Sequence, residues 1–286
     1  MSDESGPRVL VFGLDAACRE VLNPLLDDGL VPNLADLLES GVSGPLSSQI
    51  PPWTPSAWPS LFTGVNPGKH GVYGFLSFDG YDWRVVNYAD VRAHSLWELL
   101  DYHDQTSVVV NVPVTHPARK IDGAVIPGYT APENPDCHPS GVLDAVREEI
   151  GEYRVYASET EERSAQIEGY QSLVRMRGEA FRYLTTRFEP DFGFVQFQQT
   201  DTVFHERPED DEAIEAVYRA VDREIGEILT ATDPELIAVV SDHGMGPMGG
   251  HEFRANDFLR DHGYLAASRG GEMPSWSTVA ATQLRD

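Results

Sequence analysis

The stretch Pro7-Arg-Val-Leu-Val-Phe-Gly-Leu-Asp15 is a short apolar run that ends in glycine, leucine and an acidic residue. An apolar run of this length predicts a buried β-strand over residues 7–14. Ligands of open α/β sheets bind at the carboxyl ends of the strands. We therefore expect Asp15 to emerge at the edge of the sheet where a functional site would lie.

Similar strand-like runs recur along the chain, separated by stretches with helical periodicity. The runs cover residues 107–112, 123–126, 192–197 and 236–240, and the helical patterns lie near 20–26, 32–39, 140–150, 161–188 and 211–230. Alternation of this kind predicts an α/β fold with a mainly parallel sheet flanked by helices. We expect one domain over residues 1–286, with a candidate cap or insertion at about 129–187, where the pattern fits a core sheet least.

Composition and the amino terminus bound the class of protein. The 286 residues, of which 41% are hydrophobic, suffice for a full-sized core. No apolar run approaches the ~20 residues of a membrane-spanning helix, and residues 1–8 lack the pattern of a secretory signal. Cys18 and Cys137 form no C-x-x-C pair, which fits a reducing compartment. We expect a cytoplasmic protein without a membrane partner.

The charge balance is strongly acidic. The sequence has 46 acidic and 21 basic residues, a net charge of −25, and its only lysines are Lys69 and Lys120. Such a surface repels phosphate backbones, which excludes nucleic acid as a tightly bound partner. A salt-rich cell interior would screen the self-repulsion. We expect a halophilic, archaeal host; the alternative is an ordinary acidic cytosolic protein.

Four separated patches carry residues suited to metal chemistry, and three of them follow predicted strands. Carboxylate oxygen and imidazole nitrogen are ligands of Zn²⁺ and Mn²⁺. Any one such Asp would more often be a turn or capping residue, but their joint occurrence favours a metal site. An Asp and a His four residues apart also share a helix face. The patches hold Asp15, Thr54 (in Pro-Pro-Trp-Thr, 51–54), Asp201 with His205, and Asp242 with His243.

Thr54 is the candidate nucleophile. A hydroxyl attacks poorly at neutral pH unless a base or a metal lowers its pKa, and two divalent ions would do so while stabilising an in-line displacement that forms a phosphothreonine. Thr54 also precedes Pro55 and a helical run, so it is a candidate N-cap near the positive end of a helix. Two alternatives remain for this segment: Thr54 has a capping role only, or Ser56 is the nucleophile.

The motifs occur in an order that resembles the type I phosphodiesterase and nucleotide pyrophosphatase family of the alkaline phosphatase superfamily. They are Gly-Leu-Asp (13–15), Pro-Asn-Leu (32–34), Pro-Pro-x-Thr-x-x-x-Trp (51–58), Thr-Gly-x-Asn-Pro-Gly-Lys-His-Gly (63–71), Asn-Val-Pro-Val-Thr-His-Pro (111–117), Asp-x-x-x-His (201–205) and Ser-Asp-His-Gly-Met-Gly (241–246). The joint occurrence is far more specific than any single motif.

The resemblance implies a three-layer α/β/α sandwich and a site with two divalent ions, usually zinc, with manganese as the alternative. Asp15, Asp242 and His243 would hold one ion, Asp201 and His205 would hold the other, and Thr54 would lie beside them as the nucleophile. The implied function is metal-dependent hydrolysis of a small phosphate ester, either a phosphodiester or a phosphomonoester.

Two positions depart from the family pattern. The family's third histidine for the second ion lies well downstream of Gly-Tyr-Leu, whereas this sequence ends at Asp286, soon after Leu265. We expect either a truncated chain or a substitute ligand, for which His251 is the candidate. The asparagine that nucleotide pyrophosphatases carry after the His-Gly motif would fall near Phe75. The resemblance therefore does not imply nucleotide specificity.

Three other functions are alternatives to phosphate-ester hydrolysis. A sulfatase requires a Cys/Ser-x-Pro-x-Arg context, which is not found around Thr54. A phosphoglycerate mutase-like phosphotransferase uses a serine nucleophile, unlike Pro-Pro-Trp-Thr. An inactive or purely metal-binding relative is the non-enzymatic alternative, suggested by the missing histidine.

The acidic composition generates one prediction. If the host is halophilic, the Tm of the purified protein should rise steadily as KCl is increased from low to molar concentration, because added ions screen carboxylate repulsion. A thermal-unfolding series at fixed pH measures this. A flat response up to molar salt would contradict the halophilic interpretation.

Overall fold

A five-stranded parallel sheet forms the centre of the computed structural model, which describes residues 6–80, 82–158, 160, 162–247 and 253–266. The strands lie in the order β5-β4-β6-β1-β7. Their bounds are β1 Val9–Leu14, β4 Ser107–Val110, β5 Gly123–Ile126, β6 Phe192–Phe197 and β7 Leu236–Val240. All four pairings in this sheet are parallel, which confirms the predicted fold class.

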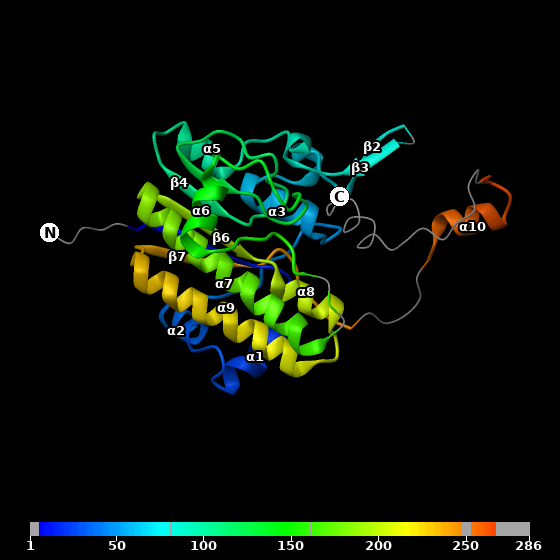
Figure 1. Ribbon diagram of the computed structural model, residues 1–286. Coiled ribbons are helices and arrows are strands. Elements are labelled where there is room, and N and C mark those ends of the chain that lie inside the picture. The colour runs from blue at the N-terminus through cyan, green and yellow to red at the C-terminus, as the bar shows by residue number, and fades with distance from the viewer. Residues whose placement is uncertain (1–5, 81, 159, 161, 248–252, 267–286) are drawn as a thin grey trace.

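Helices cover both faces of the sheet (Figure 1). One face packs against α1 Arg19–Asp27, α2 Pro32–Ser40, α6 Val142–Ile150, α7 Arg163–Phe188 and α9 Asp211–Thr232. The other packs against α3 Thr54–Thr63 and α5 Leu96–Asp101. The remaining elements are α4 Pro67–His70, the antiparallel hairpin of β2 Leu76–Asp79 and β3 Asp82–Val85, the 3₁₀ helix η1 Tyr88–Asp90, α8 Gln199–Glu206 and α10 Ala255–Asp261.

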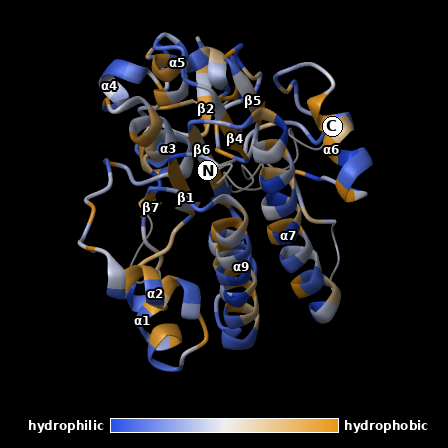
Figure 2. Cartoon of the chain, turned by 90° about the vertical axis from the view of Figure 1, so that its left-hand side faces the viewer, coloured by the Kyte–Doolittle hydropathy of each residue, from blue (hydrophilic) through white to orange (hydrophobic). Residues whose placement is uncertain are grey.

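Side-chain alternation explains why the sheet has a helical layer on each side. In β1, Leu10, Phe12 and Leu14 belong to the core shared with α7 and α9, while Val9 and Val11 pack against the core that contains α3 and α5. A strand that is buried on both faces needs apolar residues at every position, as the sequence has. Apolar (orange) and polar (blue) patches recur along α7 and α9, which fits helices that bury one face against the core and expose the other (Figure 2).

The strands and the long helices lie where the sequence pattern predicts them, with three differences. The strand expected over 107–112 ends at Val110, because Asn111 has a positive φ of 64° that a strand cannot accommodate. The hairpin β2–β3 turns at Gly80, which also has a positive φ, and was not predicted. The short helices α4 and α5 were also not predicted, since four and six residues are too few to show helical periodicity.

The range 129–187, the candidate cap, contains α6, α7 and the connecting loops. Within it, α7 packs against α9 and the sheet as part of a helical layer. The fully buried Arg177 of α7 donates hydrogen bonds to the carbonyls of Arg154 and Val155, which fastens the preceding loop to the helix. A cap over the substrate stays a prediction.

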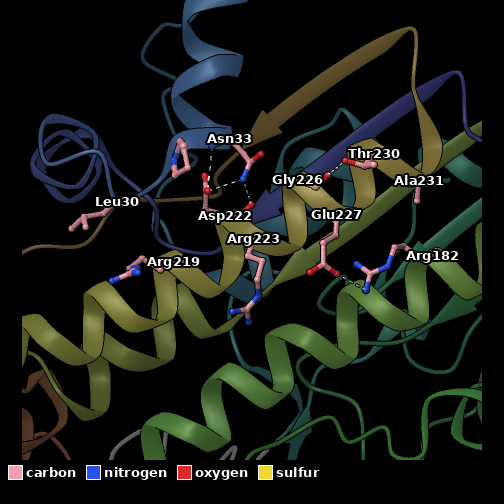
Figure 3. A pocket seen from close by; sticks show the side chains of 11 residues that line it. Leu30, Asn33, Arg182, Arg219, Asp222, Arg223, Gly226, Glu227, Thr230 and Ala231 are labelled. Carbon is pink, nitrogen blue, oxygen red and sulfur yellow. Dashed lines mark hydrogen bonds and ion pairs between the residues drawn. The ribbon is translucent and has the colours of Figure 1, made fainter.

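The Pro-Asn-Leu motif (32–34) has a structural explanation in the contact between α2 and α9. The N-cap residue of α2, Val31, provides no side-chain cap. Asp222 of α9 does so instead: its carboxylate accepts from the backbone N–H of Asn33 at 3.2 Å (Figure 3). It also accepts from the backbone N–H of Leu34 at 2.8 Å. A Cβ added at Gly226 would lie 2.5 Å from the Asn33 side chain, so glycine is needed there. A side chain from a different helix therefore caps α2.

Among the described residues, no helix combines the length and the apolar character that crossing a membrane requires.

Candidate metal centre

Asp15 is fully buried at the carboxyl end of β1, at the centre of the predicted site. Its Oδ2 accepts hydrogen bonds from Trp58 Nε1 at 2.7 Å and Gln196 Nε2 at 2.9 Å. Its Oδ1 lies 3.4 Å from Thr54 Oγ1 and 3.5 Å from His243 Nε2. The two oxygens thus have different surroundings, one held by neutral N–H donors and one facing the other predicted site residues.

Asp242 and His243 follow β7 in a turn beside Asp15. Asp242 Oδ1 accepts from the backbone N–H of Ala16 at 3.2 Å, and Oδ2 lies 3.4 Å from His243 Nε2. His243 Nδ1 lies 2.9 Å from the carbonyl oxygen of Gly244. Because a carbonyl only accepts, Nδ1 carries the proton and the Nε2 lone pair faces the cluster. This is the tautomer that binds a metal through Nε2.

Asp201 and His205 lie on α8, one turn apart, as their spacing predicted. Asp201 Oδ1 is 3.3 Å from His205 Nε2 but outside hydrogen-bond geometry, and the His205 side chain is largely exposed. Thr200 Oγ1 donates to the Asp15 carbonyl at 2.6 Å and so ties α8 to the end of β1. Ligand atoms of Asp15, Asp201 and His243 all lie within 4.8 Å of one another. This cluster joins members of both predicted ion sites.

Thr54 lies in this cluster with its side chain buried. Its Oγ1 is 3.2 Å from His243 Nε2, in addition to its contact with Asp15. The expectation that Thr54 is an N-cap is wrong: it is the first residue of α3, and the N-cap is Trp53, which forms no side-chain cap. Ser56, the rival nucleophile, donates to the Trp53 carbonyl at 3.1 Å and lies 2.6 Å from Gln49 Nε2. Ser56 is therefore engaged elsewhere.

The electrostatics of the cluster fit a divalent cation. Burial, reinforced by Asp242 and Asp201, raises the pKa of Asp15 well above its ordinary value. Burial also raises the pKa of Asp242 to about 6. Among the described residues, no Arg or Lys forms an ion pair with these three carboxylates, and Asp201 Oδ1 and Asp242 Oδ2 are buried without a hydrogen-bond partner. Divalent ions with oxygen and imidazole ligands would satisfy atoms of this kind.

Sequence reasoning missed the side chains that support Asp15. Trp58 and Asn111 appear in the family motifs but were assigned no role in the site, and Gln196 was not singled out. One signal was available, because Gln196 is the single polar residue in the otherwise apolar strand β6. The remaining candidate ligand, His251, lies outside the described residues.

Aromatic side chains form a row that begins beside Thr54. Ring centroids are 6.4 Å apart for Trp53 and Phe75, 6.3 Å for Phe75 and Tyr129, and 6.3 Å for Tyr129 and Tyr156. These four rings come from four separate segments. Phe75 thus contributes an apolar ring near the position at which the family resemblance would place an asparagine.

A hollow of about 740 Å³ lies elsewhere, between α2, α7 and α9 (Figure 3). None of the six predicted site residues lines it. Its polar groups bond to one another or to near neighbours: Arg182 pairs with Glu224 at 2.8 Å and with Glu227 at 3.0 Å, and Asp222 caps α2. We therefore attribute the hollow to the packing of these three helices and not to a catalytic site.

The structure thus brings carboxylates, an imidazole and a buried threonine together at the carboxyl edge of a parallel α/β sandwich. The chain belongs to the type I phosphodiesterase / nucleotide pyrophosphatase family, whose sequence pattern matches residues 9–285. Comparison with curated protein sequences gave no match.

Solved structures share the fold. Phosphonoacetate hydrolase from Sinorhizobium meliloti 1021 in complex with phosphonoformate aligns with a TM-score of 0.63 and 22% identity, covering 89% of this chain and 62% of that one. The complex of the same enzyme with phosphonoacetate aligns with a TM-score of 0.64 and 21% identity, covering 90% of this chain and 63% of that one. Murine ectonucleotide pyrophosphatase / phosphodiesterase 5 aligns with a TM-score of 0.52 and 16% identity, covering 83% of this chain and 57% of that one. At these identities the likeness shows the fold alone, and the chain spans less than two thirds of each relative.

The raised pKa of Asp242 generates a prediction for the metal-free protein. Between its ordinary pKa of 3.8 and about 6, the folded protein holds a proton that the unfolded chain has lost. The free energy of unfolding is therefore higher below pH 4 and falls as the pH rises through about 6, by about 3 kcal/mol in total. Asp242→Asn should remove this part of the decline, as measured by urea unfolding in a chelator. Identical pH profiles for the two proteins would contradict the assignment.

Proposed function

We propose that this protein hydrolyses a small phosphodiester through a phosphothreonine on Thr54, with two divalent ions, zinc or manganese, as cofactors. Asp15, Asp242 and His243 would hold one ion, and Asp201 and His205 the other. The observation that carries the proposal is the position of Thr54 Oγ1, 3.2 Å from His243 Nε2 and 3.4 Å from Asp15 Oδ1, inside a buried cluster of metal-type ligands.

In the proposed reaction, Thr54 Oγ1 attacks phosphorus in line with the bond to the leaving alcohol. A new P–O bond forms as the P–O bond to the leaving group breaks, and the proton that Thr54 loses is matched by the one that the leaving alkoxide gains. Water then attacks the phosphothreonine, which releases a phosphomonoester and restores the hydroxyl. When bound, divalent ions lower the pKa of the threonine hydroxyl and neutralise the phosphoryl oxygens.

The residues around Thr54 orient the substrate. Thr54 begins α3, so the positive end of that helix lies at the attacking oxygen and favours phosphoryl charge. The His243 proton on Nδ1 is bound by the Gly244 carbonyl, which keeps the other ring nitrogen turned toward the reacting oxygen. Trp53 and Phe75 offer an apolar surface beside it that excludes water from the leaving group.

A diester fits this surrounding better than a monoester. A phosphomonoester carries one more negative charge at neutral pH and gains from a fixed cation beside the site. Among the residues that the structure describes, no Arg or Lys forms an ion pair with the cluster carboxylates, and the row of aromatic rings begins at Trp53, the residue before Thr54. The lower charge of a diester and an apolar leaving group match these neighbours.

The nucleophile generates a prediction that can be checked with a chromogenic diester. Thr54→Ala should lower kcat at least about a thousandfold, because the covalent intermediate cannot form, while the zinc or manganese content per chain stays unchanged. Ser56→Ala is the matched control, with activity near wild type. A Thr54→Ala enzyme that retains activity, or a Ser56→Ala enzyme that loses it with its fold intact, would transfer the role away from Thr54.

Substrate class is checked by steady-state kinetics with bis-p-nitrophenyl phosphate, p-nitrophenyl phosphate and phosphonoacetate, each with zinc, manganese and molar KCl. The kcat/KM for the diester should exceed that for the monoester at least about tenfold, which corresponds to 1.36 kcal/mol in the barrier. Phosphonoacetate is included because two structures of similar fold are phosphonoacetate hydrolase. A preference for the monoester would overturn the diester proposal, and no turnover with any ester in metal-loaded protein would favour an inactive relative.

A further inference from the structure

Two buried amides, Asn111 and Gln196, lie behind Asp15 and are not among the predicted ligands. Both side chains are essentially inaccessible to solvent. Asn111 Nδ2 donates to Gln196 Oε1 at 2.8 Å, and Gln196 Nε2 donates to Asp15 Oδ2 at 2.9 Å. The amides therefore form a chain of hydrogen bonds that begins at the end of β4, crosses β6 and ends on the carboxylate that follows β1.

We propose that Gln196, oriented by Asn111, is a positioning residue that fixes Asp15 so that only its Oδ1 faces the metal centre. The proposal rests on the proposed function, because it takes Asp15 as a metal ligand. Trp58 Nε1 bonds the same Oδ2 at 2.7 Å, so this oxygen has two N–H donors. Oδ1 is directed toward Thr54 and His243 and remains free to bind an ion.

Asn111 sets the direction of the Gln196 amide without touching Asp15. An amide has a donor end and an acceptor end, and only one orientation suits a carboxylate neighbour. Asn111 Nδ2 donates to the Gln196 backbone carbonyl at 3.0 Å as well as to Oε1, so its donor end is held by two acceptors. Gln196 must then turn its oxygen toward Asn111 and its NH₂ toward Asp15. The reverse orientation would place two oxygens against each other.

The second hydrogen of the Gln196 amide is also used. Gln196 Nε2 lies 3.0 Å from Gln198 Oε1, so both N–H groups have acceptors. A buried network in which the amide hydrogens of both Asn111 and Gln196 have acceptors is rigid, because a rotation breaks at least one hydrogen bond in a medium where an unpaired group is costly. Asp15 is thereby held by a network rather than by a single contact.

The backbone is adapted to this network at three positions. Asn111 has a φ of 64°, which asparagine tolerates better than most residues. A Cβ at Gly128 would lie 1.9 Å from the Asn111 carbonyl oxygen, and a Cβ at Gly13 would lie 2.6 Å from the Trp58 ring. Glycine at both positions is therefore required for the two donors to reach their places.

Neutral donors suit this position better than a cation would. An arginine beside Asp15 would cancel part of the negative charge that attracts a divalent ion. Amide and indole N–H groups orient the carboxylate without adding a formal charge, which leaves the charge of Asp15, Asp201 and Asp242 for the ion. Groups that bond to metal ligands in this way typically change metal affinity or activity 10–100-fold when they are removed.

The first test is Gln196→Met, which keeps the length of the side chain and removes the amide. Chelator competition should show that Zn²⁺ and Mn²⁺ bind about 10–100-fold more weakly. At saturating ion, kcat for the chromogenic diester should fall while KM stays within about twofold. Val174→Ala, a buried core change in α7, is the matched control: it should lower Tm and leave metal affinity unchanged.

The second test is a double-mutant cycle with Asn111→Gly, which keeps the positive φ and removes the donor. Alone, it should weaken metal binding several-fold, because the Gln196 amide loses its fixed direction. In the Gln196→Met background it should cause no further loss, because Asn111 acts on Asp15 only through Gln196. Thermal unfolding of each variant separates lost stability from lost affinity.

Two results would overturn the inference: wild-type metal affinity in Gln196→Met, or losses that multiply in the double variant. Failure of the proposed reaction would give a different result. If the Thr54→Ala enzyme stays active, the reaction does not pass through a phosphothreonine, but the comparison of metal affinity between wild type and Gln196→Met remains valid. Wild-type protein that binds neither Zn²⁺ nor Mn²⁺ would remove the metal centre itself, and the positioning role with it.

Discussion

Parallel pairing of β1 with both β6 and β7 places the ends of three strands at one level of the sheet. Leu14 lies opposite Phe197, and Gly13 lies opposite Val240. The acidic residues that follow these strands therefore meet in a small buried volume, where like charges repel and water is excluded. Three features lie beside these carboxylates and suit their negative charge. They are the positive end of α3 at Thr54, the His243 tautomer with its proton on Nδ1, and the N–H donors that bind Asp15. A divalent cation is the simplest counter-charge.

Local sequence pattern predicted the strands and singled out the six candidate site residues because each signal is contained in a few adjacent positions. An apolar run that ends in Asp15 or in Asp242 marks both a strand and the edge at which it stops. The contact of Asn111 with Gln196 could not be predicted in this way, since it depends on β4 lying beside β6, and the two residues are 85 positions apart in the sequence. The N-cap of α3 differed by one residue, the usual uncertainty of a helix end.

The motifs that identify the family do not all serve the same purpose. Asp15, Thr54 and the residues that follow β7 form the cluster itself. Asn33 and Leu34 instead receive the carboxylate of Asp222 at the start of α2, far along the helical layer. Gly13 makes room for Trp58. An ordered set of motifs thus contains a candidate metal centre together with the packing contacts that hold its strands and helices in place.

The strand that carries Asp242 and His243 is also the one at the end of the sheet. Among the described strands, β7 pairs only with β1, and its Leu236 and Val239 are 59% and 40% exposed. An edge strand opens locally at a lower free-energy cost than a central one. Because opening would carry Asp242 and His243 away from Asp15, any ion held by the proposed ligand set would favour the closed arrangement of β7. Amide hydrogen exchange in β7 would then slow as the ion concentration rises.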